Sequence, residues 1–295
     1  MIARPKMWDQ LDESTLEKYQ RLQKIVANAG KVVVALSGGV DSSFLLKVCK
    51  DVLGDRVIAV TASSESFPER EVSQAKEIAK TVGCRHIIIE TSELDVPGFS
   101  ENPPHRCYLC KRELFGKISH LAREQGIDVI FDGSNADDTG DFRPGRKALR
   151  ELGVRSPLLE AGLSKEEIRA LSRALGLPNW ERPPFACLAS RFPYRTRITK
   201  RALERVGKSE DFLFQLGFRL FRVRDHGDLA RVELGEREFQ ELWERALFSQ
   251  LVEGLKSAGY QFVTLDLEGY RPGSMNRTLT QEEMEEALGH PMDSK

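Results

Sequence analysis

The chain has 295 residues, and its 44 Lys and Arg side chains nearly balance 45 Asp and Glu side chains, for a formal net charge of −1. Hydrophobic residues make up 40% of the chain and charged residues 30%, the balance of an ordinary globular protein. The near-neutral charge argues against indiscriminate nucleic-acid binding, and no stretch approaches the roughly 18 to 20 apolar residues of a membrane span. The N-terminal segment lacks the apolar core of a signal peptide, so we expect a cytoplasmic protein.

The chain contains five cysteines, Cys49, Cys84, Cys107, Cys110 and Cys187. An odd number without an export signal predicts reduced thiols rather than a disulfide framework. Two of them are predicted to pack in the core, because Cys49 lies on the apolar face of a predicted helix and Cys84 precedes a predicted strand.

The first part of the chain alternates predicted helices and strands. Residues 14–29 have apolar positions at helical spacing. Short apolar runs typical of strands buried on both faces follow at residues 32–36 and 56–61. Two more strands are predicted at residues 85–90 and 128–132, with helical segments between the strands. This alternation predicts an α/β fold with a doubly wound parallel sheet, and such sheets bind ligands beyond the C-terminal ends of their strands.

The alternation ends at residues 177–195, which are rich in proline and aromatic residues and predict a linker that is also a functional loop. Beyond it we expect a smaller α+β domain with helices at 199–216 and 236–258 and strands at 219–224, 229–234 and 261–267. The last twenty or so residues are polar and predicted to fray. We therefore place the domains at residues 1–177 and 178–295.

The segment Ser37-Gly38-Gly39-Val40-Asp41-Ser42-Ser43 follows a buried strand and opens a helix. Glycines let the backbone N–H groups turn inward, the helix N-terminus adds partial positive charge, and the hydroxyls are donors, so the segment predicts an anion cradle. No lysine ends the loop, which separates it from the GxxxxGK[ST] loop of other NTPases. The alternative is a plain glycine-rich turn.

This SGGVDSS segment resembles the signature of the PP-loop ATP pyrophosphatases, which adenylylate a substrate and release pyrophosphate. The resemblance implies that the loop holds the ATP phosphates, with Mg²⁺ near Asp41, and that Thr61 and Ala62 contact adenosine. The loop residues concerned are Ser37, Gly38, Gly39, Asp41, Ser42 and Ser43.

A polar turn follows the fourth predicted strand, at the edge where nucleotide and substrate should meet. We expect Asp132, Asn135 and Asp137 to contact the nucleotide or its metal. The alternative is a solvated Asx-rich turn.

Two cysteine segments could carry chemistry. Cys107 and Cys110 form a CxxC pair at a predicted helix start, which suits a redox pair, half a metal site or two cluster ligands, or else thiols that pack and order the loop. Cys187 lies in an irregular loop with Arg182 and Arg191 nearby, and basic neighbours favour a reactive thiolate. The alternative for Cys187 is a small buried hydrophobe.

Further stretches resemble the LarE family of sulfur transferases, which build the nickel-pincer cofactor of lactate racemase. They are NPPHRCYLCK, FDGSNADDTGDFRPGRKAL, RSPLLEAGLSKEEIRALSRALGLPNW, PPFACLASRFPYRTRIT and DLEGYRPGSMN, and they extend over nearly the whole chain. The resemblance implies that ATP adenylylates a carboxylate of pyridinium-3,5-biscarboxylic acid mononucleotide. Cys187 would then displace AMP and give up its sulfur, which leaves dehydroalanine in the protein.

Some LarE-type proteins instead carry a [4Fe-4S] cluster held by three cysteines. No cysteine follows Cys187 in this chain, so such a set would have to recruit Cys107 and Cys110. We therefore favour the sacrificial route over the cluster.

The second domain offers arginines for a phosphate-bearing substrate. Arg222 and Arg224 alternate along one predicted strand, so their side chains share a face, and they resemble the arginines that bind phosphate at subunit interfaces of the family. Arg191, in the Cys187 loop, is a third candidate. The alternative for Arg222 and Arg224 is that they lie on a solvated strand face and bind no phosphate. The resemblance also implies a homo-oligomer such as a hexamer.

Other functions share the phosphate loop. A tRNA thiolation enzyme is the main alternative, although nucleic-acid binding is disfavoured by the neutral charge. An NAD synthetase or other amide-forming ligase would not need Cys187, and a non-enzymatic nucleotide-binding regulator would release no pyrophosphate.

Overall fold

The computed structural model describes residue 8, residues 11–140 and residues 142–289. The chain forms two compact units. The first unit contains the described residues up to Ser64, together with Glu69–Thr91 and Cys110–Phe185. The second unit contains Glu65–Pro68, Ser92–Leu109 and the described residues from Ala186 onward. The boundary predicted between residues 177 and 178 stays a prediction.

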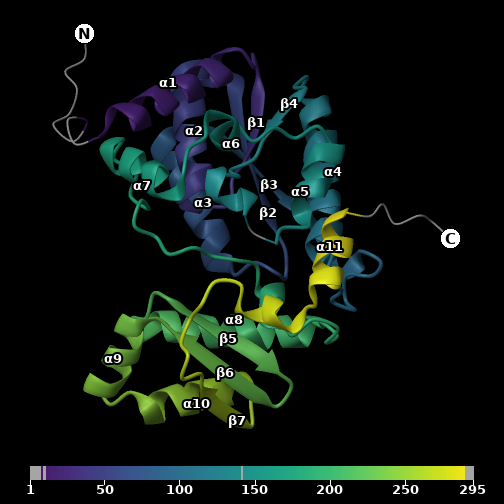
Figure 1. Ribbon diagram of the computed structural model, residues 1–295, viewed down its shortest axis with the longest axis vertical. Coiled ribbons are helices and arrows are strands. Elements are labelled where there is room, and N and C mark those ends of the chain that lie inside the picture. The colour runs from purple at the N-terminus through teal and green to yellow at the C-terminus, as the bar shows by residue number, and fades with distance from the viewer. Residues whose placement is uncertain (1–7, 9–10, 141, 290–295) are drawn as a thin grey trace. The chain divides into compact units, whose positions relative to one another are not determined.

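The first unit is built on a four-stranded parallel sheet with the order β3-β2-β1-β4 (Figure 1). Its strands are β1 (Val32–Ala35), β2 (Val57–Ser63), β3 (Arg85–Glu90) and β4 (Val129–Phe131). Its helices are α1 (Glu13–Ala27), α2 (Val40–Leu53), α3 (Glu69–Val82), α5 (Gly145–Glu151), α6 (Pro157–Ala161), α7 (Lys165–Ala174) and most of α4 (Arg106–Glu124), whose first turn up to Leu109 belongs to the second unit. The predicted parallel α/β sheet is confirmed.

Strand β1 is apolar at every position and is buried on both faces of the sheet, whereas the edge strand β3 is partly exposed. Val32 and Val34 pack into a core with α1, α2 and α3, whereas Val33 points into a second core with α4 and α5. Neighbouring side chains of a strand point to opposite faces, so a continuous valine run suits a strand covered by helices on both sides. This burial fixes the strand that leads into the phosphate loop.

The second unit contains a three-stranded sheet with the order β5-β6-β7, in which β5 and β6 are antiparallel and β6 and β7 are parallel. Its strands are β5 (Phe221–His226), β6 (Leu229–Leu234) and β7 (Phe262–Leu265). Its helices are α8 (Lys200–Gln215), α9 (Glu236–Glu244), α10 (Phe248–Ala258) and α11 (Gln281–Gly289). The expected small α+β fold is confirmed, and no helix in the described ranges is long and apolar enough to cross a membrane.

Three sequence-based expectations in this unit were wrong in detail. Strand β5 begins two residues late, because the Glu238 carboxylate accepts the N–H groups of Arg219 and Leu220 before the ladder starts. The helix predicted at 236–258 breaks into α9 and α10 around Ala246, whose φ is 49°. Part of the segment predicted to fray is α11, which Thr280 and Glu283 cap reciprocally. Residues 290–295 lie outside the described residues.

Candidate functional site

The phosphate loop connects β1 to α2 and packs against α3. Gly38 has a φ of 76°, and a Cβ there would lie 3.1 Å from the backbone N of Ala75 and 3.2 Å from the carbonyl O of Glu71. Only glycine fits this turn. Gly39 is the N-cap of α2 and offers no side-chain cap, so the helix N-terminus keeps its affinity for an anion.

The serine hydroxyls of the loop bind the loop itself. Ser42 Oγ lies 3.0 Å from Ser37 Oγ and accepts the Ser37 N–H at 3.2 Å. The buried Ser43 hydroxyl donates to the Gly39 carbonyl at 2.7 Å. These bonds hold the cradle in shape without a ligand. Their predicted contacts with phosphate stay predictions.

Asp41 has the character of a cation ligand. Its Oδ2 accepts a hydrogen bond of 3.1 Å from Asn135 Nδ2, while its Oδ1 is buried without a hydrogen-bond partner in the described structure. Burial raises the pKa of Asp41, and Asp138 adds to the rise, whereas Lys165 and Arg169 oppose it. A buried carboxylate oxygen without a partner beside a phosphate loop fits a divalent cation.

The turn after β4 packs directly against the phosphate loop, as the position of Gly133 shows. A Cβ on Gly133 would lie 3.0 Å from the backbone N of Ser42. Asn135 is buried, bonds to Asp41 and caps a short helix through the Asp137 N–H. The other two predicted residues have protein partners: Asp132 accepts from Ser134 and Ser156, and exposed Asp137 accepts the Lys165 N–H. A solvated turn does not describe Asn135.

The predicted adenosine contacts lie at the end of β2. Thr61 is buried, and its hydroxyl donates to the Leu36 carbonyl at 2.6 Å and lies 2.8 Å from His86 Nε2. Ala62 is half-buried. Their contact with adenosine stays a prediction.

The linker segment, residues 178–185, contacts the phosphate loop. Asn179 Nδ2 donates to the Gly38 carbonyl at 3.0 Å and to Ser43 Oγ at 2.9 Å. Arg182 Nη1 donates to the same carbonyl at 3.2 Å, and Arg182 Nη2 forms an ion pair of 2.6 Å with Glu71. The sequence predicted a longer functional loop, residues 177–195, that includes this segment, but it identified Arg182 only as a basic neighbour of Cys187 and missed Asn179.

In the second unit, Cys187 begins the cysteine loop, residues 187–191. Its side chain is half-buried, and its carbonyl accepts the Ser190 N–H at 3.0 Å and the Ser190 hydroxyl at 2.8 Å. Arg106, which is 4% exposed, is close enough to Cys187 and to Cys107 to interact with both electrostatically. The structure thus brings Cys107 near Cys187.

The charge on the Cys187 thiol differs from the sequence-based expectation. Burial raises the pKa of Cys187; Arg106 and Arg191 oppose the rise, and Cys107 and Glu93 increase it. The expectation that this thiol prefers its thiolate form was therefore wrong, because the effect of desolvation on the pKa outweighs that of the neighbouring cations. The main counter-charge is Arg106, which lies far away in sequence.

The three candidate arginines are buried, so a solvated strand face is excluded. Arg222 stacks on Tyr270 with 4.8 Å between its guanidinium carbon and the ring centre, and burial, followed by Arg191, lowers its pKa to about 10. Arg224 pairs with Glu233 at 2.6 Å. Arg191 is 0% exposed and forms a bidentate pair with Glu210, with distances of 2.7 and 2.9 Å.

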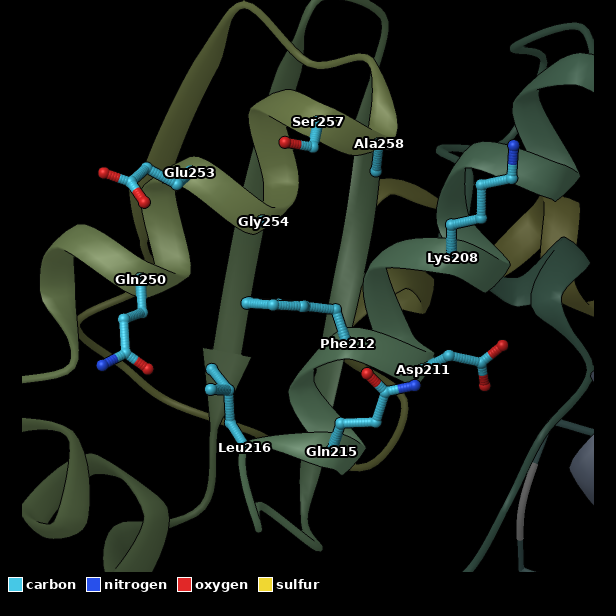
Figure 2. A pocket seen from close by; sticks show the side chains of 10 residues that line it. All are labelled: Lys208, Asp211, Phe212, Gln215, Leu216, Gln250, Glu253, Gly254, Ser257 and Ala258. Atoms are coloured by element: carbon cyan, nitrogen blue, oxygen red, sulfur yellow. The ribbon is translucent and has the colours of Figure 1, made fainter.

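Within residues 8, 11–140 and 142–289, no three His, Cys, Asp or Glu side chains are grouped as a metal site requires. A cavity of about 700 Å³ lies between α8 and α10, where Phe212 extends toward Gly254 (Figure 2). Its lining includes Lys208, Asp211 and Glu253 but none of the predicted site residues. This cavity is therefore separate from the candidate site.

Comparison with known proteins connects these features. Residues 10–101, which include the phosphate loop, match the NAD synthase family. Over 256 residues the chain is 39% identical to the pyridinium-3,5-bisthiocarboxylic acid mononucleotide synthase of Lactiplantibacillus plantarum, covering 86% of this chain and 92% of that protein. The chain belongs to this synthase family, the LarE family. The predicted resemblance is confirmed, and with it the class of ATP-dependent sulfur-transferring enzymes.

Two further relatives of this LarE-family chain are uncharacterized proteins. One, from Synechocystis sp., is 42% identical over 263 residues, which cover 89% of this chain and 98% of that protein. Another, from Methanocaldococcus jannaschii, is 27% identical over 242 residues, which cover 82% and 91%. The similarity to both extends over most of each chain.

For this LarE-family protein we expect the rate at which iodoacetamide alkylates Cys187 to keep rising with pH above the pH at which the rate for an ordinary thiol levels off. Because the pKa is raised, thiolate is scarce near neutral pH and grows about tenfold per pH unit below the pKa. Arg106→Gln should move the profile to still higher pH, because it removes the largest opposing cation. Mass spectrometry of the alkylated peptide across pH measures this.

Arg195→Gln is the matched control, because Arg195 pairs with the Glu283 carboxylate at the surface. Its profile should equal that of the wild type. An unchanged or more acidic profile for Arg106→Gln would contradict the assignment of Arg106 as the counter-charge.

Proposed function

We propose that the protein uses ATP to adenylylate a carboxylate of pyridinium-3,5-biscarboxylic acid mononucleotide and then transfers sulfur from Cys187 to that carboxylate. The observation that carries the proposal is the 39% identity to the pyridinium-3,5-bisthiocarboxylic acid mononucleotide synthase. The phosphate loop and the half-buried thiol supply the two chemical functions that this reaction needs.

In the first step the substrate carboxylate attacks the α-phosphorus of ATP, forming an acyl adenylate and releasing pyrophosphate. The Gly38–Gly39 turn and the N-terminus of α2 would hold the phosphates, with the hydroxyls of Ser37, Ser42 and Ser43 around them. Asp41 would bind Mg²⁺ through its unpartnered oxygen, and Mg²⁺ would neutralise phosphate charge.

In the second step the Cys187 thiolate attacks the acyl carbon and AMP leaves with the bonding electron pair, which gives a thioester. A base then removes the Cα proton of Cys187, and the electron pair forms the Cα–Cβ double bond as the Cβ–S bond breaks. Sulfur leaves as the thiocarboxylate, and residue 187 becomes dehydroalanine. Arg106 would favour the attacking thiolate.

The substrate also carries a phosphate, and the buried arginines suit it. Arg222 and Arg224 lie on one face of β5, and burial together with the nearby charge of Arg191 lowers the pKa of Arg222. An anion would relieve the repulsion between these cations. We propose that Arg222 and Arg224 bind this phosphate, whereas the contacts of Arg191 support a role in holding the cysteine loop.

A cluster-dependent version of the same sulfuration is the second candidate, favoured by one observation. Cys107 lies near Cys187, and Cys110 is one turn along α4 from Cys107, on the same helical side. Since the described residues contain no group of three metal ligands, we derive no step through a [4Fe-4S] cluster.

Intact-mass spectrometry after incubation with ATP, Mg²⁺ and substrate tests the proposal. The sacrificial route predicts that the chain loses one sulfur and two hydrogens, mapped to residue 187, as thiocarboxylate forms. Sulfurated product from a chain of unchanged mass would overturn this route and support the cluster. We also propose, from the family resemblance, a cytoplasmic homo-oligomer.

A further inference from the structure

The peptide between Gly38 and Gly39 has two sides that serve different partners. A trans peptide is planar, so the Gly39 N–H and the Gly38 carbonyl point in opposite directions. The Gly39 N–H belongs to the cradle, and among the described residues it makes one long contact of 3.4 Å, to Ser37 Oγ. The Gly38 carbonyl accepts from both Asn179 and Arg182. A phosphate that binds the N–H side therefore acts on the peptide that the linker segment holds.

The Asn179 side chain is committed to this contact. It is 5% exposed, and its amide nitrogen donates to two loop groups, the Gly38 carbonyl and Ser43 Oγ. Ser43 Oγ in turn donates to the Gly39 carbonyl. The amide thus connects the linker segment with both ends of the Gly38–Gly39 turn.

The rest of the linker segment is held by α7 and α3. Arg169 donates to the carbonyls of Trp180 and Arg182 at 2.8 and 2.6 Å, and Arg173 stacks on the Trp180 ring at 4.8 Å. Glu71 of α3 pairs with Arg182. Arg169 also acts electrostatically on Asp41, so this side chain is close to the phosphate loop as well as to the segment.

We propose that Asn179 and Arg182 are positioning residues that transmit occupancy of the phosphate loop to the chain segment that carries Cys187. Cys187 follows Arg182 by five residues, which span at most about 18 Å when extended. Phosphate binding stiffens the Gly38–Gly39 peptide, and the two side chains pass this stiffening to the segment that continues into the cysteine loop. The inference rests on the proposed function, because that function explains why the coupling would be useful. Its test does not require the substrate.

Hydrogen exchange with and without a non-hydrolysable ATP analogue and Mg²⁺ tests the coupling. In the wild type we expect the analogue to slow exchange both in the phosphate loop, residues 36–45, and in residues 179–190. In Asn179→Leu the analogue should still slow exchange in the loop. The protection that it adds in residues 179–190 should fall about tenfold relative to the wild type, because the amide donors are gone. Arg182→Lys should lose less, since lysine still reaches one acceptor.

Arg173→Gln is the matched control, because among the described residues Arg173 contacts the segment through Trp180 but not the loop. Its nucleotide response should equal that of the wild type.

Equal loss of protection in the loop and the segment of Asn179→Leu would overturn the coupling and make Asn179 part of the nucleotide site. Loop slowing without segment slowing in the wild type would overturn the coupling alone. No slowing in the loop would overturn the proposed function as well. If Asn179→Leu does not fold, Asn179→Asp with the same exchange measurement decides.

Discussion

Replacing Cys187 with alanine should abolish sulfur transfer while ATP-dependent, substrate-dependent pyrophosphate release continues. The phosphate loop, Asp41 and Asn135 bond among themselves in the first unit, so removing a thiol from the second unit leaves them intact. Product formation measured against pyrophosphate release separates the two steps. Without the nucleophile the acyl adenylate can only hydrolyse or stay bound.

Two other cysteine variants make this result specific. Cys84→Ala should leave transfer unchanged, because Cys84 is 9% exposed and packs in the core of the first unit. Cys107→Ala should retain a single turnover on the sacrificial route, whereas the cluster route requires Cys107 as a ligand. Loss of pyrophosphate release in Cys187→Ala would contradict the assignment, because Cys187 would then be needed before sulfur moves.

Features encoded within short segments were predictable from the sequence. The apolar runs of β1, β2 and β4 suit a sheet covered by helices, whereas the edge strand β3 stays partly exposed, with Ile88 37% exposed. The glycine turn requires a φ that other residues avoid. The phosphate loop and the alternation of Arg222 and Arg224 are likewise local patterns. Asp41, Asn135 and the loop serines meet because parallel strands end at the same edge of a sheet.

Long-range contacts could not be predicted. Arg106 affects Cys187 across a long stretch of chain, and Asn179 reaches Gly38 across 141 residues. No periodicity links such positions, because their proximity depends on how loops pack. The prediction that Cys187 prefers its thiolate form failed for the same reason. Its basic neighbours could be read from the sequence, whereas the extent to which the thiol is desolvated depends on tertiary structure.

Arg191→Met should both destabilise the second unit and stop sulfur transfer. Arg191 and Glu210 are 0% and 1% exposed, so the variant removes the cation that pairs with a buried carboxylate and leaves only the charge of Arg222 nearby, at a cost of up to about 3–5 kcal/mol in the free energy of unfolding. Arg191 Nη1 also donates to the carbonyls of Ala186 and Cys187 at 3.1 and 3.4 Å. The variant therefore removes a support of the residue that supplies sulfur.

The double variant Arg191→Met/Glu210→Gln separates the two effects. Glutamine carries no charge and still accepts the Val223 N–H that Glu210 accepts at 3.1 Å, so urea unfolding should show most of the lost stability restored. Sulfur transfer should stay low, because the cysteine loop still lacks its donor, while pyrophosphate release continues. Recovery of both would show that Arg191 only stabilises the fold. A weaker affinity for substrate with unchanged stability would instead show that Arg191 contacts the substrate directly, as its place in the sequence first suggested.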